Sequence, residues 1–227
     1  MKYSFIILLL IYLGIVMSRF APSTQTSIPT SPLAGIVPHH LLVSDIIQGF
    51  FSTLQPHRFD NIVVIGPNHA ELGPTTIAKN PDFDDQAISS LKPYIDTTFP
   101  QTRLTTYLLK HSVSLAECAR LAKEIKSLGG ETLVIASIDF SHYLNVEQAL
   151  QNDRLTLSKI KSREYASILT MNSDYLDSPG ALVTLLQYID LQGEATMDIL
   201  SYDNSGLRAN AYAPTTSYYS IIFYGQN

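Results

Sequence analysis

The sequence contains one cysteine, no tryptophan and few charged residues, and each scarcity excludes a class of protein. A single cysteine among 227 residues cannot form an intrachain disulfide. Cys118 lies at helical spacing with Leu121 and Ile125, which is typical of a small buried side chain rather than a nucleophile. Charged residues make up 15% of the chain, which excludes a coiled coil and a disordered protein. The formal net charge is −5 and no run of Lys or Arg occurs, so nucleic acid is not an expected partner.

Residues 1–20 are predicted to be a targeting segment. Lys2 precedes an apolar run from Phe5 to Met17, which is the pattern of a secretory signal. The run is shorter than the roughly 20 apolar residues of a full membrane span, which favours a signal peptide. No small-x-small cleavage site follows, so an uncleaved membrane anchor stays open. In both cases we expect an extracytoplasmic protein, secreted or anchored to the membrane. Residues 21–32 are rich in Ser, Thr and Pro and predict a linker.

Residues 33–227 predict one α/β domain, because short apolar runs alternate with stretches of helical periodicity. Strands are expected at 33–37, 61–65, 75–78, 103–109, 132–136, 196–202 and 218–224. Helices are expected at 41–54, 114–128 and 181–191, and one or two helices at 146–169. The segment 84–95 is ambiguous, because Pro93 would kink or end a helix there. The alternation indicates three αβα layers, with helices on both faces of one central, mostly parallel or mixed sheet.

Histidines follow three of the predicted strands. They are His39 and His40 after 33–37, His69 after 61–65, and His142 after 132–136. Because the carboxyl ends of parallel strands meet at one edge of a sheet, we expect these side chains to converge on one crevice, together with Asp139. Such a group suits a metal site or proton transfer near neutral pH. The alternative is a set of polar residues that cap neighbouring loops. His57 is expected at the opposite edge, and His111 on the surface.

Three blocks of the sequence resemble the Memo family, whose bacterial and archaeal members are called AmmeMemoRadiSam system protein B. The blocks are GIVPHH at 35–40, VVIGPNHAELG at 63–73 and LVIASIDFSHY at 133–143. The resemblance covers roughly residues 33–224. The family is similar in fold to the LigB-type class III extradiol dioxygenases, so the resemblance implies a LigB/Memo-like α/β domain. Those dioxygenases hold non-haem Fe(II) with two histidines and a carboxylate, whereas Memo proteins have two histidines and a cysteine at these positions.

The resemblance implies a metal-ligand set in which two family residues are replaced. His69 matches the first ligand histidine, Gln86 stands where the second would be, and Asp177 stands where the cysteine would be. A glutamine amide is a weak ligand for a transition metal, whereas Asp177 restores a carboxylate. His111 lies in KHSV, which spells the core of the second block. Because this segment follows a predicted strand that the family's block precedes, we assign Gln86 to the position.

The resemblance also implies a catalytic group. His142 corresponds to the acid/base histidine of the dioxygenases and His39 to the histidine of the first Memo block, with Asp139 beside them. The implied cofactor is a divalent transition metal, Fe, Cu or Zn, on His69, Asp177 and either Gln86 or a further histidine. One hypothesis is therefore an exported domain with metal-dependent redox or hydrolytic chemistry. The other is a non-catalytic extracytoplasmic module that binds a small molecule or peptide, which the loss of a histidine at position 86 favours.

Overall fold

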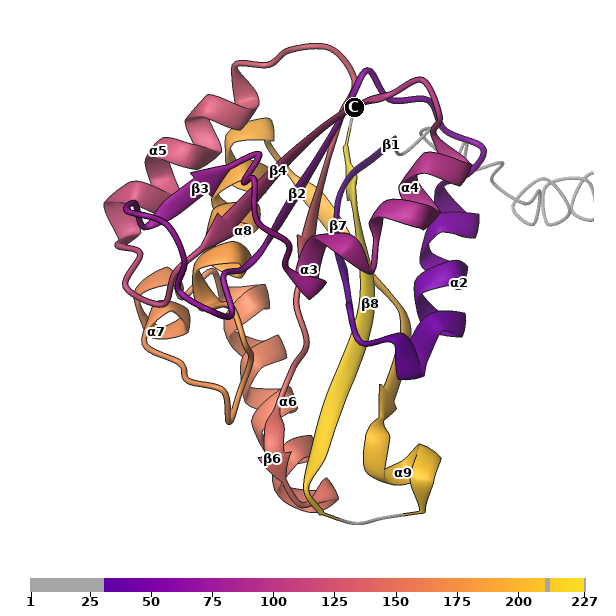
Figure 1. The fold of residues 1–227 in the computed structure, drawn as a ribbon, viewed down its shortest axis with the longest axis vertical. Helices are drawn as coiled ribbons and strands as arrows, with labels where there is room; N and C mark the ends of the chain where they lie inside the picture. Colours follow the sequence, from indigo (N-terminus) through magenta and orange to yellow (C-terminus); the bar gives the residue numbers. More distant parts are fainter. Residues whose placement is uncertain (1–30, 211–212, 227) are drawn as a thin grey trace, which may run out of the picture.

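Strands of both directions form one mixed sheet in the computed structural model, which describes residues 31–210 and 213–226 (Figure 1). The strands are β1 (Ser31–Val37), β2 (Asn61–Pro67), β3 (Ile77–Lys79), β4 (Arg103–Leu109), β5 (Thr132–Ser137), β6 (His142–Leu144), β7 (Ala195–Asn204) and β8 (Thr215–Gly225). Their order is β3-β4-β2-β5-β1-β8-β6, and β7 pairs with β8. The central β4, β2, β5 and β1 are parallel, whereas β3, β6, β7 and β8 run antiparallel to their partners. The carboxyl ends of four parallel strands therefore share one edge.

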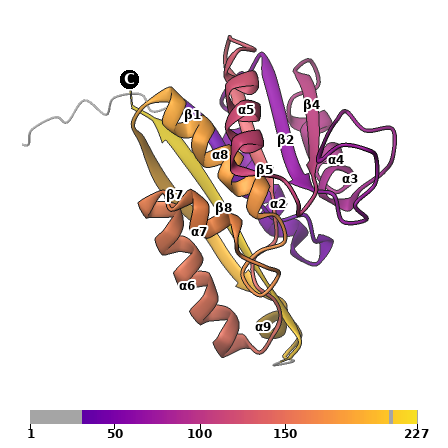
Figure 2. The same cartoon turned by 90° about the vertical axis from the view of Figure 1, so that its left-hand side faces the viewer.

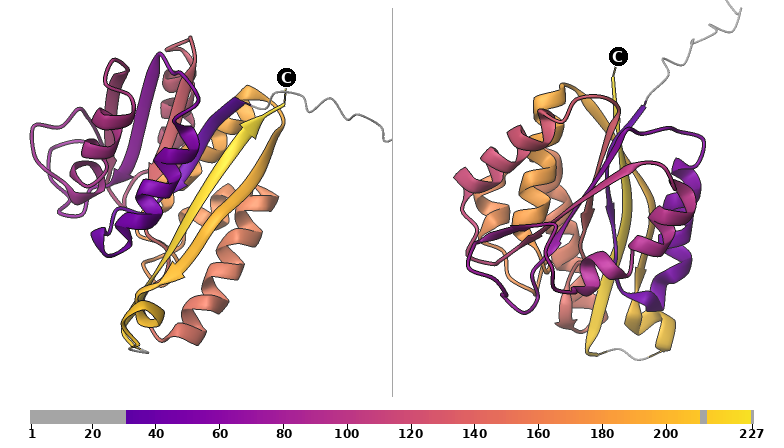
Figure 3. Two further views of the ribbon diagram at one scale, coloured as in Figure 1. Left: turned by 90° about the vertical axis from the view of Figure 1, so that its right-hand side faces the viewer. Right: turned by 45° about the horizontal axis from the view of Figure 1, so that its top comes forward.

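Helices cover both faces of this sheet and confirm the predicted three-layer αβα class. They are the 3-10 helix η1 (Leu41–Val43) and the α-helices α2 (Ser44–Leu54), α3 (Gln86–Ser89), α4 (Lys92–Thr98), α5 (Leu115–Lys126), α6 (Val146–Ser162), α7 (Tyr165–Leu169), α8 (Pro179–Gln192) and α9 (Ser205–Ala209). Helices α5 to α8 lie on one face (Figure 2), and α2 and α4 lie on the other (Figure 3). Side chains of β2 alternate accordingly, since Val63 and Ile65 join the core of the first face and Ile62 and Val64 that of the second.

The structure differs from the sequence predictions mainly in short elements. The segment 84–95 holds two helices, and Pro93 lies in the first turn of α4, where its missing N–H breaks no helical hydrogen bond. The short strand β6 and the short helix α9 are additional to the predicted elements, because segments of three to five residues leave little periodicity. By contrast, the predicted helix at 114–128 is present as α5 and begins with a capping box, in which Ser114 and Glu117 exchange both hydrogen bonds.

The N-terminal predictions fall largely on residues that the structure does not describe. The signal peptide or anchor at 1–20 lies outside the described residues, as does most of the linker at 21–32. Ser31 and Pro32, which we expected in the linker, are the first residues of β1, where they pair with Gly225 and Tyr224 of β8. Among the helices of the described residues, none has both the length and the apolarity to cross a membrane.

Gly66 allows α3 to approach the carboxyl end of β2 closely. A Cβ atom at this position would lie 2.6 Å from the Cβ of Ala87 and 3.4 Å from the carbonyl oxygen of Ser137. A separation of 2.6 Å is well inside van der Waals contact, so a larger residue would push α3 away. Asp85, the N-cap of α3, is thereby held beside His69.

Candidate metal centre

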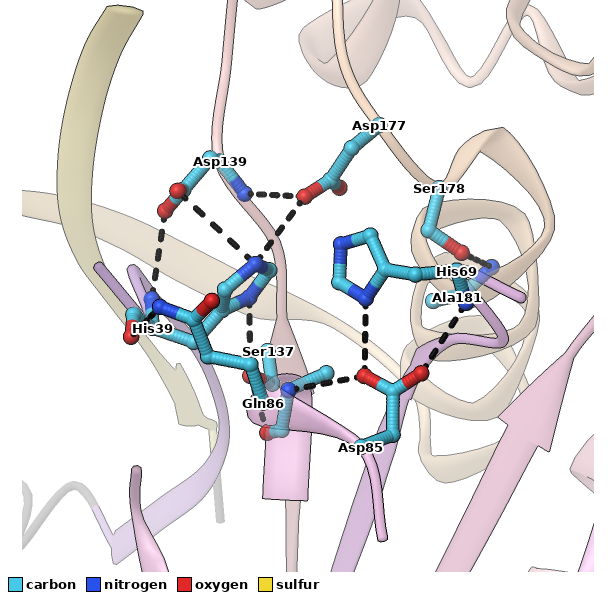
Figure 4. Close-up of polar contacts among 10 residues, drawn as sticks. His39, His69, Asp85, Gln86, Ser137, Asp139, Asp177, Ser178 and Ala181 are labelled. Atoms are coloured by element: carbon cyan, nitrogen blue, oxygen red, sulfur yellow. Dashed lines mark hydrogen bonds and ion pairs between the residues drawn. The ribbon is translucent and has the colours of Figure 1, made fainter. Parts of the chain in front are cut away.

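Four of the predicted site residues meet at the carboxyl edge of the parallel strands (Figure 4). His39 and His69 each lie two residues beyond the end of β1 and β2, and Asp139 lies two residues beyond β5. Asp177 comes from the segment that leads into α8. His39, Asp139 and Asp177 are 3%, 2% and 8% exposed, whereas 43% of the His69 side chain is exposed. The cluster therefore has a buried floor and opens to solvent at His69.

The hydrogen bonds of His39 determine which ring nitrogen carries its proton. The hydroxyl of Ser137 donates to the carbonyl oxygen of Ala87 at 2.6 Å. Its oxygen can then only accept from the Nδ1–H of His39, 3.3 Å away. The lone pair of Nε2 consequently faces Oδ2 of Asp177 at 3.4 Å and Oδ2 of Asp139 at 3.8 Å. Burial lowers the pKa of His39, which agrees with a neutral ring.

His69 is oriented by the carboxylate of Asp85. Nδ1 of His69 lies 2.7 Å from Oδ1 of Asp85, whose Oδ2 accepts from the backbone N–H of His69 at 2.9 Å. The hydrogen bond with Asp85 raises the pKa of His69. Burial alone would raise the pKa of Asp85, but hydrogen bonds from His69 and the N–H of Ala87 outweigh it and lower that pKa. In the neutral ring the proton stays on Nδ1, so Nε2 is left with its lone pair.

Asp177 is buried without full hydrogen bonding. Its Oδ2 accepts from the backbone N–H of Asp139 at 3.1 Å, but its Oδ1 is buried and has no partner among the described residues. Burial, together with the negative charge of Asp139, raises the pKa of Asp177 well above its usual range. His142 has a similar deficit, since its Nδ1 is buried without a partner in the described part of the chain and burial lowers its pKa.

Two overlapping trios of these residues could hold a metal ion. Ligand atoms of His39, His69 and Asp177 all lie within 4.8 Å of one another, and so do those of Asp139, His142 and Asp177. Ligands at about 2.0–2.2 Å from one ion are at most about 4.4 Å apart, so small side-chain adjustments would suffice. Asp177 belongs to both trios.

Other candidate residues lie at the margin of the cluster. Nε2 of Gln86 donates to the backbone carbonyl of His39 at 3.4 Å. His40 is exposed, and its Nδ1 accepts from the N–H of Leu42 at the start of η1. His111 is also exposed, and its backbone N–H donates to Glu71. His40 therefore has the capping position that the alternative interpretation gives to such histidines, and His111 has the surface position that the sequence predicts.

The sequence predictions missed Asp85 and Ser137, which fix the two histidine rings. Asp85 carries one usable signal, because Asp directly before a short helical run is a common N-cap. Ser137 carries none, since its contact with His39 joins residues 98 positions apart.

Comparison with known proteins agrees with the motif blocks. No protein-family model matches the chain. A MEMO1 family protein of Pyrobaculum aerophilum, PAE0818, is 22% identical over 85% of this chain and 83% of its own length. Another, of Desulfurococcus amylolyticus, is 24% identical over 89% of this chain and 87% of its own. The chain is a relative of the MEMO1 family proteins. The resemblance predicted from the sequence is thereby confirmed.

A solved structure supports the fold of this Memo-like protein. The crystal structure of JW3007 from Escherichia coli K12 matches 85% of this chain and 99% of that chain with a TM-score of 0.54. The sequences are 11% identical, so the likeness concerns the fold alone.

Four large apolar side chains that neighbour the site histidines in the sequence are exposed to solvent. Leu41, Leu42, Leu72 and Tyr143 are 56%, 46%, 44% and 74% exposed. Each lies within three residues of one of the histidines that follow the strands.

Proposed function

We propose that this Memo-like protein binds a divalent transition metal through Nε2 of His39, Nε2 of His69 and the carboxylate of Asp177. The observation that carries the proposal is the protonation pattern of the two rings. Ser137 and Asp85 hold the protons on Nδ1, so both histidines direct a lone pair from Nε2. Metal-binding histidines characteristically donate their other ring N–H in this way.

The charges and lone pairs of the cluster also fit a cation. Nε2 of His39 and Oδ2 of Asp177 lie 3.4 Å apart, and a lone pair would face a carboxylate oxygen unless a proton or a metal lies between them. Asp177 is buried beside Asp139, and a buried carboxylate is costly unless its charge is compensated. Two imidazoles and one carboxylate suit Fe(II), Cu(II) and Zn(II). A bound ion of this kind supplies a Lewis acid at the open side of the cluster.

The proposed ligand set uses His39 in place of Gln86. The sequence left open whether Gln86 or a further histidine completes the set with His69 and Asp177. The Gln86 amide faces the carbonyl of His39, whereas the His39 ring faces Asp177. This arrangement supports His39 as the third ligand.

The test is metal binding by the full chain. Purified protein is loaded with Fe(II) or Zn(II), and bound metal is measured by elemental analysis. We expect His69→Ala to lower the affinity for the ion at this position at least tenfold. The control His111→Ala, at an exposed histidine outside both trios, should leave the affinity unchanged. Equal metal binding by folded wild type and His69→Ala would overturn the proposal.

A metal-free binding module on the same fold is the second candidate function. Gln86 favours it, because the family's ligand histidine is replaced there by a weak ligand. Folded wild-type protein that binds no metal in the same experiment would decide for this candidate. In either case the proposed place of action is extracytoplasmic, on the basis of the apolar run from Phe5 to Met17.

A further inference from the structure

We propose a second cation position formed by Asp139, His142 and Asp177, so that the protein holds two divalent cations bridged by the Asp177 carboxylate. The inference rests on the proposed function, because the first cation is the one on His39, His69 and Asp177. It changes the expected role of His142 from the acid/base implied by the resemblance to a metal ligand.

The geometry of Asp177 suits a bridge. Its Oδ2 is turned toward Nε2 of His39 at 3.4 Å, in the first trio. Its Oδ1 has no partner among the described residues and is left for the second trio, whose ligand atoms also lie within 4.8 Å of one another. A carboxylate can bind one ion with each oxygen, and paired metals in enzymes lie about 3.5–4 Å apart.

Unpartnered buried atoms supply an independent observation. Four buried side-chain nitrogen or oxygen atoms lack a hydrogen-bond partner within the described ranges, and two of them are Oδ1 of Asp177 and Nδ1 of His142. Asp177 is only 8% exposed, so solvent does not compensate its free oxygen. Buried polar atoms are nearly always paired, and two exceptions in one trio indicate a ligand such as an ion.

The backbone holds the three side chains in place. The N–H of Asp139 donates to Oδ2 of Asp177, and the N–H of Asp177 donates to the carbonyl of Asp139, both at 3.1 Å. The hydroxyl of Ser141 donates to the buried Asp153 at 2.7 Å. The N–H of His142 donates to the carbonyl of Ser173 at 2.9 Å. The loop from β5 to β6 is therefore fixed against the segment before α8 without any ion.

The experiment counts ions bound to the full chain. Isothermal titration with Zn(II) gives the stoichiometry, and Mn(II) electron paramagnetic resonance detects coupling between two bound ions. We expect about two equivalents and a coupled Mn(II) spectrum for the wild type. His142→Ala and the size-conserving His142→Gln should each bind about one equivalent and lose the coupling. His69→Ala should also bind about one equivalent of metal. Asp177→Asn should lower the affinity for both ions at least tenfold. His111→Ala, the control, should still bind two equivalents.

The outcomes separate this inference from the proposed function. Two equivalents that fall to one in both His142 variants support the second position. One equivalent in the wild type, unchanged in folded His142→Gln and lost in His69→Ala, overturns the second position and leaves the first intact. No bound ion in folded wild-type protein overturns both. Circular dichroism confirms the fold of each variant.

Discussion

Oδ1 of Asp85 lies 2.7 Å from Nδ1 of His69, and the same carboxylate accepts hydrogen bonds from the backbone N–H groups of His69 and Ala87. One aspartate thus fixes the position, the orientation and the protonated nitrogen of the candidate ligand. Carboxylate partners of this kind commonly change metal affinity by about 10- to 100-fold.

Asp85→Asn is therefore expected to lower the affinity for the ion on His69 by about 10- to 100-fold, although it removes no ligand. An asparagine amide can donate to Nδ1, which would move the ring proton to Nε2, where the metal binds. Competition with a chromophoric chelator measures the affinity. Asp96→Asn is the matched control, because Asp96 is an exposed carboxylate paired with Lys92. Equal affinities for the wild type and the Asp85 variant would contradict the orienting role.

The pair also predicts how pH affects the stability of the metal-free protein. The pKa of His69 is raised, so its contribution is fully present below the unfolded pKa and is lost as pH rises through the folded value. The pKa of Asp85 is lowered, so its contribution is lost as pH falls through its folded value.

The stability that Asp85→Asn removes should accordingly be larger near pH 5.5 than near pH 9. Thermal unfolding of the wild type and of this variant in the presence of a chelator measures the difference. Some of it should remain near pH 9, because the backbone N–H groups still donate to the carboxylate. A difference that grows from about pH 5.5 to about pH 9 would contradict the assignment of the proton.

Gln86→Ala is expected to change metal affinity by less than about tenfold. The Gln86 amide contacts the backbone carbonyl of His39 at 3.4 Å, a distance that gives a weak hydrogen bond. His39→Gln, which removes an imidazole from the same side of the cluster, should have the much larger effect. If the two variants lose affinity equally in the chelator competition, Gln86 is a ligand, as the resemblance implies.

Gly66→Ala should destabilise the fold by about 1–3 kcal/mol, because the new methyl group would lie 2.6 Å from the Cβ of Ala87. Gly49→Ala offers a contrast within α2. Nothing lies within 4 Å of a Cβ atom there among the described residues, so the substitution should stabilise the helix by about 0.5–1 kcal/mol. Urea unfolding of both variants gives the two free energies of unfolding. A neutral result at position 66 would show that α3 can move away from β2 at little cost.

The sequence predicts the architecture well because buried parallel strands are continuous apolar runs. The run 62–65 has no polar residue, and the structure covers it on both faces. The histidines that follow these strands are also predictable as a group, since the ends of parallel strands meet. The segment 84–95 is ambiguous in the sequence because Pro93 would break a helix if it lay in the helix interior but is tolerated in a first turn.

The details of the site depend on contacts that leave no local pattern. His39 and Ser137 are 98 residues apart, and their contact decides which nitrogen of His39 carries the proton. Asp85 reaches His69 only because Gly66 leaves space for α3. Tertiary packing of this kind is invisible to periodicity, so the sequence names the histidines without stating how each is oriented.

The reciprocal hydrogen bonds between Asp139 and Asp177 have a consequence for the motions of the protein. They join the loop after β5 to the segment before α8, so either segment can open only when the other is released. The amide protons of these two residues should exchange with solvent at the same rate. A cation that binds both carboxylates would slow the exchange of both amide protons together. The two segments would then open and close as one cooperative unit.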